Sequence, residues 1–246
     1  MVVYMENREV FSTITAIPPV FVRLDGRAFH GLAEKLSLKK PFDERFKDAM
    51  VQVCTALVAD SGLNPEFAFT FSDEISLYFV KLPFNGRVEK IDSVTASFAS
   101  SALTFALGMS YPLSFDARVI PSTPEFAIEY LASRQNEAWR NHLNGYCQQA
   151  LIEEGMSAKK AAEQLKGLPA KDLHEMMHVR DFNLATTPAW QRRGVLVYKK
   201  ITLKEGFNPI TQEHVVAERS AVTVDQDLLL FTTPEGQAFL RSLVGI

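Results

Sequence analysis

Residues 20–26 read Val20-Phe21-Val22-Arg23-Leu24-Asp25-Gly26, a β-favouring run that ends where Gly26 permits a sharp turn. Two further strand-like runs, 67–71 and 75–80, are separated only by Ser72-Asp73-Glu74. A gap this short predicts a hairpin turn between them. We therefore expect Asp25 at the end of one strand, and Asp73 and Glu74 at the tip of a hairpin.

Two helical patterns and a fourth strand alternate with these runs. Residues 41–61 place apolar side chains at three- and four-residue steps, with Pro41 at the start and Gly62 just past the end. Residues 88–109 form a second helical stretch rich in small side chains, and 114–120 is again strand-like. The order β-α-β-β-α-β predicts the split βαβ sheet of ferredoxin-like and polymerase-palm folds.

The second half of the chain is mainly helical before it returns to strands. The expected helices and strands lie at 124–154, 158–166, 171–177, 195–203 and 214–224. We predict that the last two runs form a second hairpin that closes the fold. The protein is thus expected to be α+β, with a palm-like core at 1–122 and a helical and β-hairpin appendage at 123–246 packed on it.

Composition restricts the class of protein. The chain has 246 residues, 47% hydrophobic and 22% charged, which is typical of a globular protein and excludes a disordered tail or a coiled-coil rod. Cys54 and Cys147 form no CxxC motif, which favours free thiols in a reducing compartment. The first residues have no signal-peptide pattern, and no apolar run approaches roughly 18 residues. We therefore expect a cytoplasmic protein that is neither secreted nor membrane-spanning.

The carboxylates at the predicted strand ends suggest a chemistry. In a split βαβ sheet the first strand lies beside the middle hairpin, so Asp25 and Asp73 face each other and Glu74 lies next to them. Aspartate oxygens suit Mg²⁺ that is shared with substrate phosphates, an arrangement that serves nucleotidyl transfer. The peptide N–H groups of residues 27–30 offer an anion nest, and Arg27 and Lys40 offer compensating charge. Ordinary turn chemistry is the alternative interpretation of both acidic segments.

A second motif points to a different chemistry. Residues 174–178 read His174-Glu175-Met176-Met177-His178, the HExxH pattern of zinc peptidases on a predicted helix. The metzincin extension fails, because its glycine and third-histidine positions hold Asp181 and Leu184. A zinc peptidase and a structural helix are the two interpretations of this segment.

Several blocks of the chain closely resemble the tRNA-histidine guanylyltransferase family, including its guanylyltransferase-like tRNA-repair members. The resemblance covers roughly the first 200 residues in one order. Its blocks are Val22–His30, Ala33–Lys35, Lys39–Asp43, Ser72–Glu74, Ala99–Ser101, Phe115–Val119, Ser133–Gln135, Asp181–Asn183 and Arg192–Gly194.

The resemblance implies a palm-like enzyme that adds nucleotides to the 5′ end of tRNA in the 3′-to-5′ direction, using ATP, GTP and other nucleoside triphosphates. It implies that Asp25, the Gly26 carbonyl and Asp73 hold two Mg²⁺ ions, and that Asp25, Asp73 and Glu74 are the catalytic carboxylates. The implied nucleotide-binding residues are Arg27, Ala28, Phe29, His30, Lys40, Asp43 and Ser72, with Arg87 and Lys90 for a second triphosphate. The candidate RNA-binding residues are Arg134, Asn141 and Arg193.

One departure from the family pattern bears on specificity. Histidine-tRNA members carry His-Ile-Asn-Asn where this chain reads Trp139-Arg140-Asn141-His142. The resemblance therefore favours template-dependent repair of shortened tRNA 5′ ends over addition of an extra guanosine to histidine tRNA. A non-catalytic tRNA-binding relative is the alternative outside enzymes. The family also implies a homotetramer built from dimers.

Overall fold

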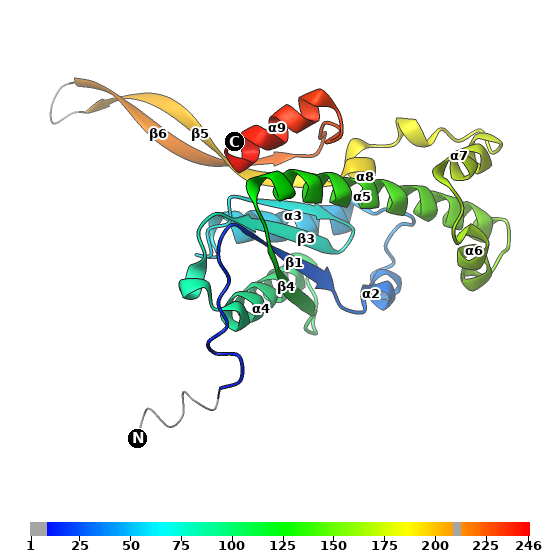
Figure 1. Ribbon diagram of the computed structural model, residues 1–246. Coiled ribbons are helices and arrows are strands. Elements are labelled where there is room, and N and C mark those ends of the chain that lie inside the picture. The colour runs from blue at the N-terminus through cyan, green and yellow to red at the C-terminus, as the bar shows by residue number, and fades with distance from the viewer. Residues whose placement is uncertain (1–8, 209–212) are drawn as a thin grey trace.

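The computed structural model describes residues 9–208 and 213–246 (Figure 1). Its centre is one six-stranded sheet of order β4-β1-β3-β2-β5-β6, in which every neighbouring pair is antiparallel. Because β3 lies between β1 and β2, the predicted split βαβ core is confirmed. The strands are β1 (Val20–Gly26), β2 (Phe67–Phe71), β3 (Glu74–Phe79), β4 (Phe115–Pro121), β5 (Val195–Asn208) and β6 (Glu213–Asp225).

Helices cover both faces of this sheet. They are α2 (Phe29–Lys35), α3 (Glu44–Ala59), α4 (Val88–Ala106), α5 (Pro124–Glu153), α6 (Ala158–Leu165), α7 (Ala170–His178), α8 (Ala189–Arg193) and α9 (Pro234–Val244), with short 3-10 turns η1 (Pro83–Gly86) and η2 (Leu184–Thr186).

Two features of the second half differ from expectation. The β5–β6 hairpin is not a separate layer, because β5 pairs with β2 and extends the core sheet. The prediction that this hairpin closes the fold is wrong, because α9 follows it. The side chain of Thr233 caps the start of α9, and Leu240 and Val244 bury its apolar face.

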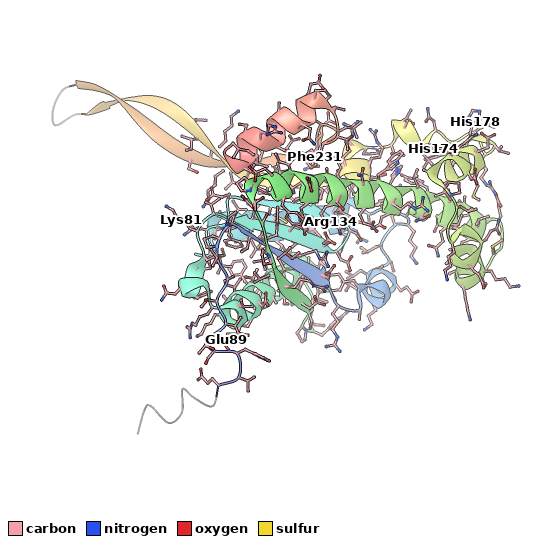
Figure 2. The ribbon with its side chains drawn as sticks, in the orientation of Figure 1. Lys81, Glu89, Arg134, His174, His178 and Phe231 are labelled. Atoms are coloured by element: carbon pink, nitrogen blue, oxygen red, sulfur yellow. The ribbon has the colours of Figure 1, made fainter. Side chains whose placement is uncertain are left out.

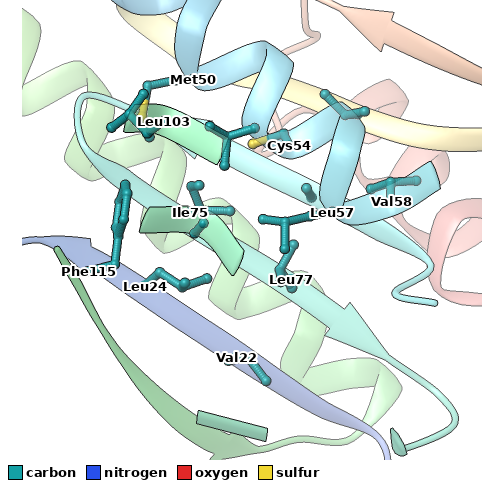
Figure 3. Close-up of a cluster of buried hydrophobic side chains, with 14 of the residues drawn as sticks. Val22, Leu24, Met50, Cys54, Leu57, Val58, Ile75, Leu77, Leu103 and Phe115 are labelled. Atoms are coloured by element: carbon teal, nitrogen blue, oxygen red, sulfur yellow. The ribbon is translucent and has the colours of Figure 1, made fainter. Parts of the chain in front are cut away.

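Side-chain alternation along the strands separates two cores. On one face, Val22 and Leu24 of β1 pack with Ile75 and Leu77 of β3 against α3 and α4 (Figure 3). Cys54 and Leu57 of α3 are fully buried in the same cluster. The predicted amphipathic helix therefore buries the face that its periodicity indicates.

The opposite face of the sheet is covered by α5 and α9 (Figure 1). Phe21 of β1 stacks on Tyr130 of α5 with ring centroids 4.1 Å apart, and Phe231 packs in the same cluster. This core joins residues from both predicted halves, 1–122 and 123–246, whose division stays a prediction. By alternation, Asp25 and Glu74 lie on this second face, at its open end.

The second half of α5 extends past the sheet and carries a small helical lobe (Figure 1). We define the α6–α7 lobe as α6, α7 and the residues of α5 that pack on them. Its core contains Leu143, Cys147, Leu151, Ala161, Leu165, Leu173, Met177 and Leu184. Within residues 9–208 and 213–246, no helix is long and apolar enough to cross a membrane.

Candidate active site at the ends of β1 and β3

The backbone brings the two acidic segments together. Asp25 lies opposite Glu74 in the antiparallel register, and the N–H of Gly26 donates to the carbonyl of Asp73 at 3.1 Å. A Cβ atom at Gly26 would lie 2.5 Å from Cδ2 of Phe29, so the close packing of that ring requires a glycine here. The predicted placement of Asp25, Asp73 and Glu74 at neighbouring strand ends is confirmed.

Arginines surround two of the three carboxylates. Oδ2 of Asp25 lies 3.1 Å from Nη2 of Arg118 and 3.5 Å from Nε of Arg23. Oε2 of Glu74 lies 3.2 Å from Nη1 of Arg134, which comes from α5. Glu74 is buried, yet its Oε1 has no hydrogen-bond partner among the described residues. That oxygen is free to accept a further bond.

Asp73 is the carboxylate of this cluster whose negative charge is least compensated by positive groups. Burial raises its pKa, and the negative charge of Asp25 raises it further, while a 3.2 Å hydrogen bond from Ser72 offsets only part of this. No arginine or lysine of the described residues pairs with it. Burial also raises the pKa of Glu74, against the opposing charges of Arg134 and Arg23. The cluster therefore lacks positive charge at Asp73.

These carboxylates fit the predicted metal chemistry. Within the described residues, no three His, Cys, Asp or Glu side chains form a complete metal cage. Two aspartates and a backbone carbonyl instead match Mg²⁺, which takes few protein oxygens and completes its shell with water and substrate phosphates. The uncompensated charge of Asp73 is what such a cation would neutralise. Asp25, the Gly26 carbonyl and Asp73 are thus the residues that would hold it.

A pocket of about 510 Å³ opens beside Asp73, between α2, α3, α5 and α8. Its volume is within the range of pockets that hold small organic ligands. Phe42 and Trp190 form aromatic walls, with ring centroids 5.9 Å apart. The pocket brings together Asp73, which was predicted to hold a metal ion, and five residues predicted for nucleotide or RNA contact, namely Phe29, Lys40, Asp43, Ser72 and Asn141.

Asp43 lines this pocket and also caps a helix. Its carboxylate accepts hydrogen bonds from the N–H groups of Lys39 at 2.7 Å and Arg45 at 2.8 Å, at the start of α3. Burial raises the pKa of Asp43, but these bonds and the charge of Arg45 outweigh it, so that the pKa lies below its ordinary value. The nucleotide contact of Asp43 stays a prediction.

Other predicted residues lie elsewhere. Arg87 and Lys90 stand at the start of α4, at the end of the sheet opposite Asp25, near the labelled Glu89 in Figure 2. Arg193 donates from Nη1 to the carbonyl of Leu228 at 2.6 Å. Arg27 and Ala28 line a second, smaller pocket. The side chain of His30 lies outside the described residues.

The histidine motif lies in the α6–α7 lobe, away from the strand ends (Figure 2). Leu173 and Met177 bury the inner face of α7. The ring of His174 packs 5.3 Å from the ring of Trp139, centroid to centroid. His174, Glu175 and His178 form no three-residue metal group in the described part of the chain.

Comparison with known proteins decides the family. The family model Thg1, tRNAHis guanylyltransferase, matches residues 2–123. A probable tRNA(His) guanylyltransferase from Mus musculus is 34% identical over 212 residues, which cover 80% of this chain and 70% of the relative. One from Bos taurus is also 34% identical, over 89% of this chain and 78% of the relative. The chain belongs to the tRNA(His) guanylyltransferase family. It is therefore a nucleotidyltransferase.

Solved structures share the fold of this tRNA(His) guanylyltransferase family member. A bacterial guanylyltransferase-like protein in complex with ATP matches with a TM-score of 0.77 and 22% identity, over 99% of this chain and 98% of that one. The tRNA(His) guanylyltransferase of Saccharomyces cerevisiae matches with a TM-score of 0.69 and 21% identity, over 87% and 94%. The α+β palm-like fold is thus shared along almost the whole chain.

Sequence reasoning missed two arginines that shape the site of this tRNA(His) guanylyltransferase family member. Arg23 and Arg118 contact Asp25, and their signal is spacing: Arg23 lies two residues before Asp25, and Arg118 lies opposite Arg23 in the β1–β4 register. Trp190, whose indole ring the sequence offers for base stacking or for packing, lines the pocket from α8.

Proposed function

We propose that this chain restores missing nucleotides at the 5′ end of tRNA by template-directed, Mg²⁺-dependent addition in the 3′-to-5′ direction. One observation carries the proposal: Asp73 belongs to the carboxylate cluster and also lines the 510 Å³ pocket. A nucleotide in that pocket has its phosphates beside the carboxylates. Family membership supports the reaction class.

The proposed reaction has two group transfers. A 5′-monophosphorylated tRNA attacks the α-phosphate of ATP or GTP and releases pyrophosphate, which leaves a nucleotidyl-capped end. The 3′-hydroxyl of the incoming nucleotide then attacks the capped 5′ phosphate, and the nucleoside monophosphate leaves. A tRNA that already has a 5′-triphosphate needs only the second transfer.

Different residues around the pocket are proposed to bind the phosphates and the base of a nucleotide. Lys40 and Ser72 are the groups for triphosphate oxygens, because a cation and a hydroxyl both donate to them. The rings of Phe42 and Trp190 offer apolar surfaces for the base. Magnesium, when bound, neutralises phosphate charge and lowers the pKa of an attacking hydroxyl. Asp25, Asp73 and the Gly26 carbonyl would hold it in register with the pocket.

The segment that departs from the family pattern supports repair over guanylation of histidine tRNA. Nε2 of the fully buried His142 lies 2.8 Å from Oγ1 of Thr187, and the ring of Trp139 stacks on His142 at 5.2 Å. Arg140 donates to the carbonyl of Leu168 at 2.5 Å. Three of the four positions therefore serve packing, and Asn141 alone lines the pocket. Template pairing then supplies the sequence choice that these side chains do not.

The test compares two RNAs in the presence of Mg²⁺, ATP and labelled nucleotides. One is a tRNA that lacks its first 5′ nucleotide, and the other is a full-length histidine tRNA. We expect template-matched extension of the shortened tRNA alone. Addition of G to the full-length histidine tRNA alone would instead assign the guanylation activity. Binding without incorporation into either RNA would assign a non-catalytic relative.

The tRNA partner implies two further properties of the protein. We propose a homotetramer in the cytoplasm, since one subunit is small relative to a tRNA. Sedimentation of the purified protein tests the assembly, with a single species of four subunits as the expected result.

A further inference from the structure

A second pocket, of about 300 Å³, lies on the other side of α2 from the 510 Å³ pocket. Phe29 and Leu32 of α2 line both pockets, so this helix separates them. The outer wall is the loop between α4 and β4, from which residues 111–114 line the pocket. The N–H of Arg27 donates to the carbonyl of Ser114 at 2.8 Å, which ties this loop to the turn after Asp25. The second pocket therefore adjoins the candidate active site.

The lining of this pocket has two cations and an aromatic ring. Nζ of Lys35 lies 4.8 Å from the centroid of the Tyr111 ring, and Arg27 also lines the pocket. No carboxylate of the described residues forms an ion pair with Arg27 or Lys35. The side chain of Tyr111 is 36% exposed. Cations without a carboxylate partner recognise phosphate, and a partly exposed tyrosine ring stacks on a base.

We propose that this pocket binds one unpaired nucleotide of the tRNA 3′ end. The inference rests on the proposed function. In that reaction the RNA 5′ end must reach Asp25 and Asp73, while the complementary strand passes the site and continues as the single-stranded 3′ overhang. The pocket lies at the same end of the sheet as Asp25, where the two strands of the acceptor stem part. The overhang then fixes the paired end relative to the carboxylates.

The chemistry of the lining separates an unpaired nucleotide from a duplex. Backbone contacts to a duplex need only cations, whereas a tyrosine ring gains from a base whose face is free. Stacking of this kind tolerates any base, so the pocket imposes no sequence on the overhang. This property suits an enzyme that takes its sequence information from the template strand.

The experiment measures binding of two RNAs to the full-length protein. One is a 5′-shortened tRNA with its 3′ overhang, and the other is the same tRNA without the unpaired 3′ nucleotides. We expect the protein to bind the first RNA about tenfold more tightly, as the loss of one stacked base predicts. In the double variant Lys35→Ala/Tyr111→Ala, both RNAs bind with the same, weaker affinity.

Two control variants isolate the ring and the charge. Tyr111→Phe keeps the aromatic face and retains the preference for the overhang. Lys159→Ala removes a lysine on the exposed face of α6, outside both pockets, and also retains it. Circular dichroism of each variant confirms that the fold is intact.

Three results would overturn the inference. Equal affinity of the unaltered protein for the two RNAs excludes an overhang site, while extension of both RNAs would still support the proposed function. An unchanged overhang preference in the double variant places the contact elsewhere. A fall of one in the number of bound ATP molecules in the double variant, with tRNA binding unchanged, assigns the pocket to a free nucleotide.

Discussion

The carboxylate cluster of Asp25, Asp73 and Glu74 and the α6–α7 lobe each carry side chains that suit a metal ion. The two regions differ in what surrounds those side chains. In the lobe, two histidines four positions apart lie on one helix, beside Leu173 and Met177, which fill its core. At the strand ends, Asp25 and Asp73 come from distant segments and meet through the β1–β3 register.

This difference shows that the residue types of a metal-binding motif do not by themselves make a metal site. The ring of His174 is packed against Trp139 and shows no third ligand among the described residues. Asp73, in contrast, carries a raised pKa because it is buried and close to Asp25, and no cation of the described residues compensates it. A metal centre is thus indicated by unbalanced charge beside a pocket more than by spacing along a helix.

The largest effect is expected from Asp25→Ala. This change removes a carboxylate that would hold the metal, and the loss of several kcal/mol of charge stabilisation lowers nucleotide addition by about 1,000-fold. Single-turnover incorporation into a 5′-shortened tRNA measures it. Asp60→Ala, at the exposed end of α3, is the matched control and keeps full activity. Retention of activity in Asp25→Ala would show that the catalytic metal lies at another centre.

The second effect concerns what holds the lobe together. Leu173 is fully buried there, so Leu173→Ala leaves a cavity and lowers the free energy of unfolding by about 2–5 kcal/mol. Urea denaturation measures the loss, with the neighbouring Glu175→Ala as control. Recovery of the lost stability on addition of zinc would show that a metal, and not packing, holds α7.

The sequence predicts most of the fold and only part of the site, for physical reasons. The long segments 41–61 and 124–154 indicate α3 and α5 because apolar side chains recur along the face that each helix buries, although the buried face of α5 also includes Gln135 and His142. The short helix α2 was missed because its seven residues include Gly31 and give too little periodicity. The helix α9 was missed as well, and it lies beyond the roughly 200 residues that the family resemblance covers.

Some contacts of the site can be predicted from the sequence, whereas others depend on how the elements pack. Adjacency of Asp25 and Glu74 follows from strand order alone. The ion pair between Arg134 and Glu74 joins α5 to β3, and its partners depend on how the helix rotates over the sheet. The family resemblance makes Arg134 a candidate RNA-binding residue, while the structure shows it bound to the carboxylate of Glu74. Its contact with RNA stays a prediction.

A smaller effect is expected on the pH dependence of thermal stability, which reports the unbalanced charge of Asp73. Its folded-state pKa is raised above the ordinary 3.8, so its contribution to stability is full below that value and is lost as pH rises. Asp73→Asn removes this penalty and raises the Tm by a few degrees at about pH 7, and the gain disappears near pH 4. Thermal unfolding at both pH values measures it, with Asp60→Asn at the exposed end of α3 as the control. A lower Tm for Asp73→Asn at pH 7 would contradict the charge imbalance.

The smallest effect is expected from the histidines. The double variant His174→Ala/His178→Ala keeps nucleotide addition within about twofold of the unaltered chain, since surface changes away from a site cost little. Metal analysis of the purified protein accompanies the rate measurement. Stoichiometric zinc that disappears in this variant would show that the lobe is a metal site.

The most direct test of the strand-end centre compares metals on one protein. Incorporation into a 5′-shortened tRNA is measured after treatment with EDTA, and again after Mg²⁺ or Zn²⁺ is added in excess. We expect that EDTA abolishes incorporation, that Mg²⁺ restores it, and that Asp73→Ala stays inactive with either ion. Incorporation that survives EDTA, or returns with Zn²⁺ alone, would contradict a magnesium centre at Asp25 and Asp73.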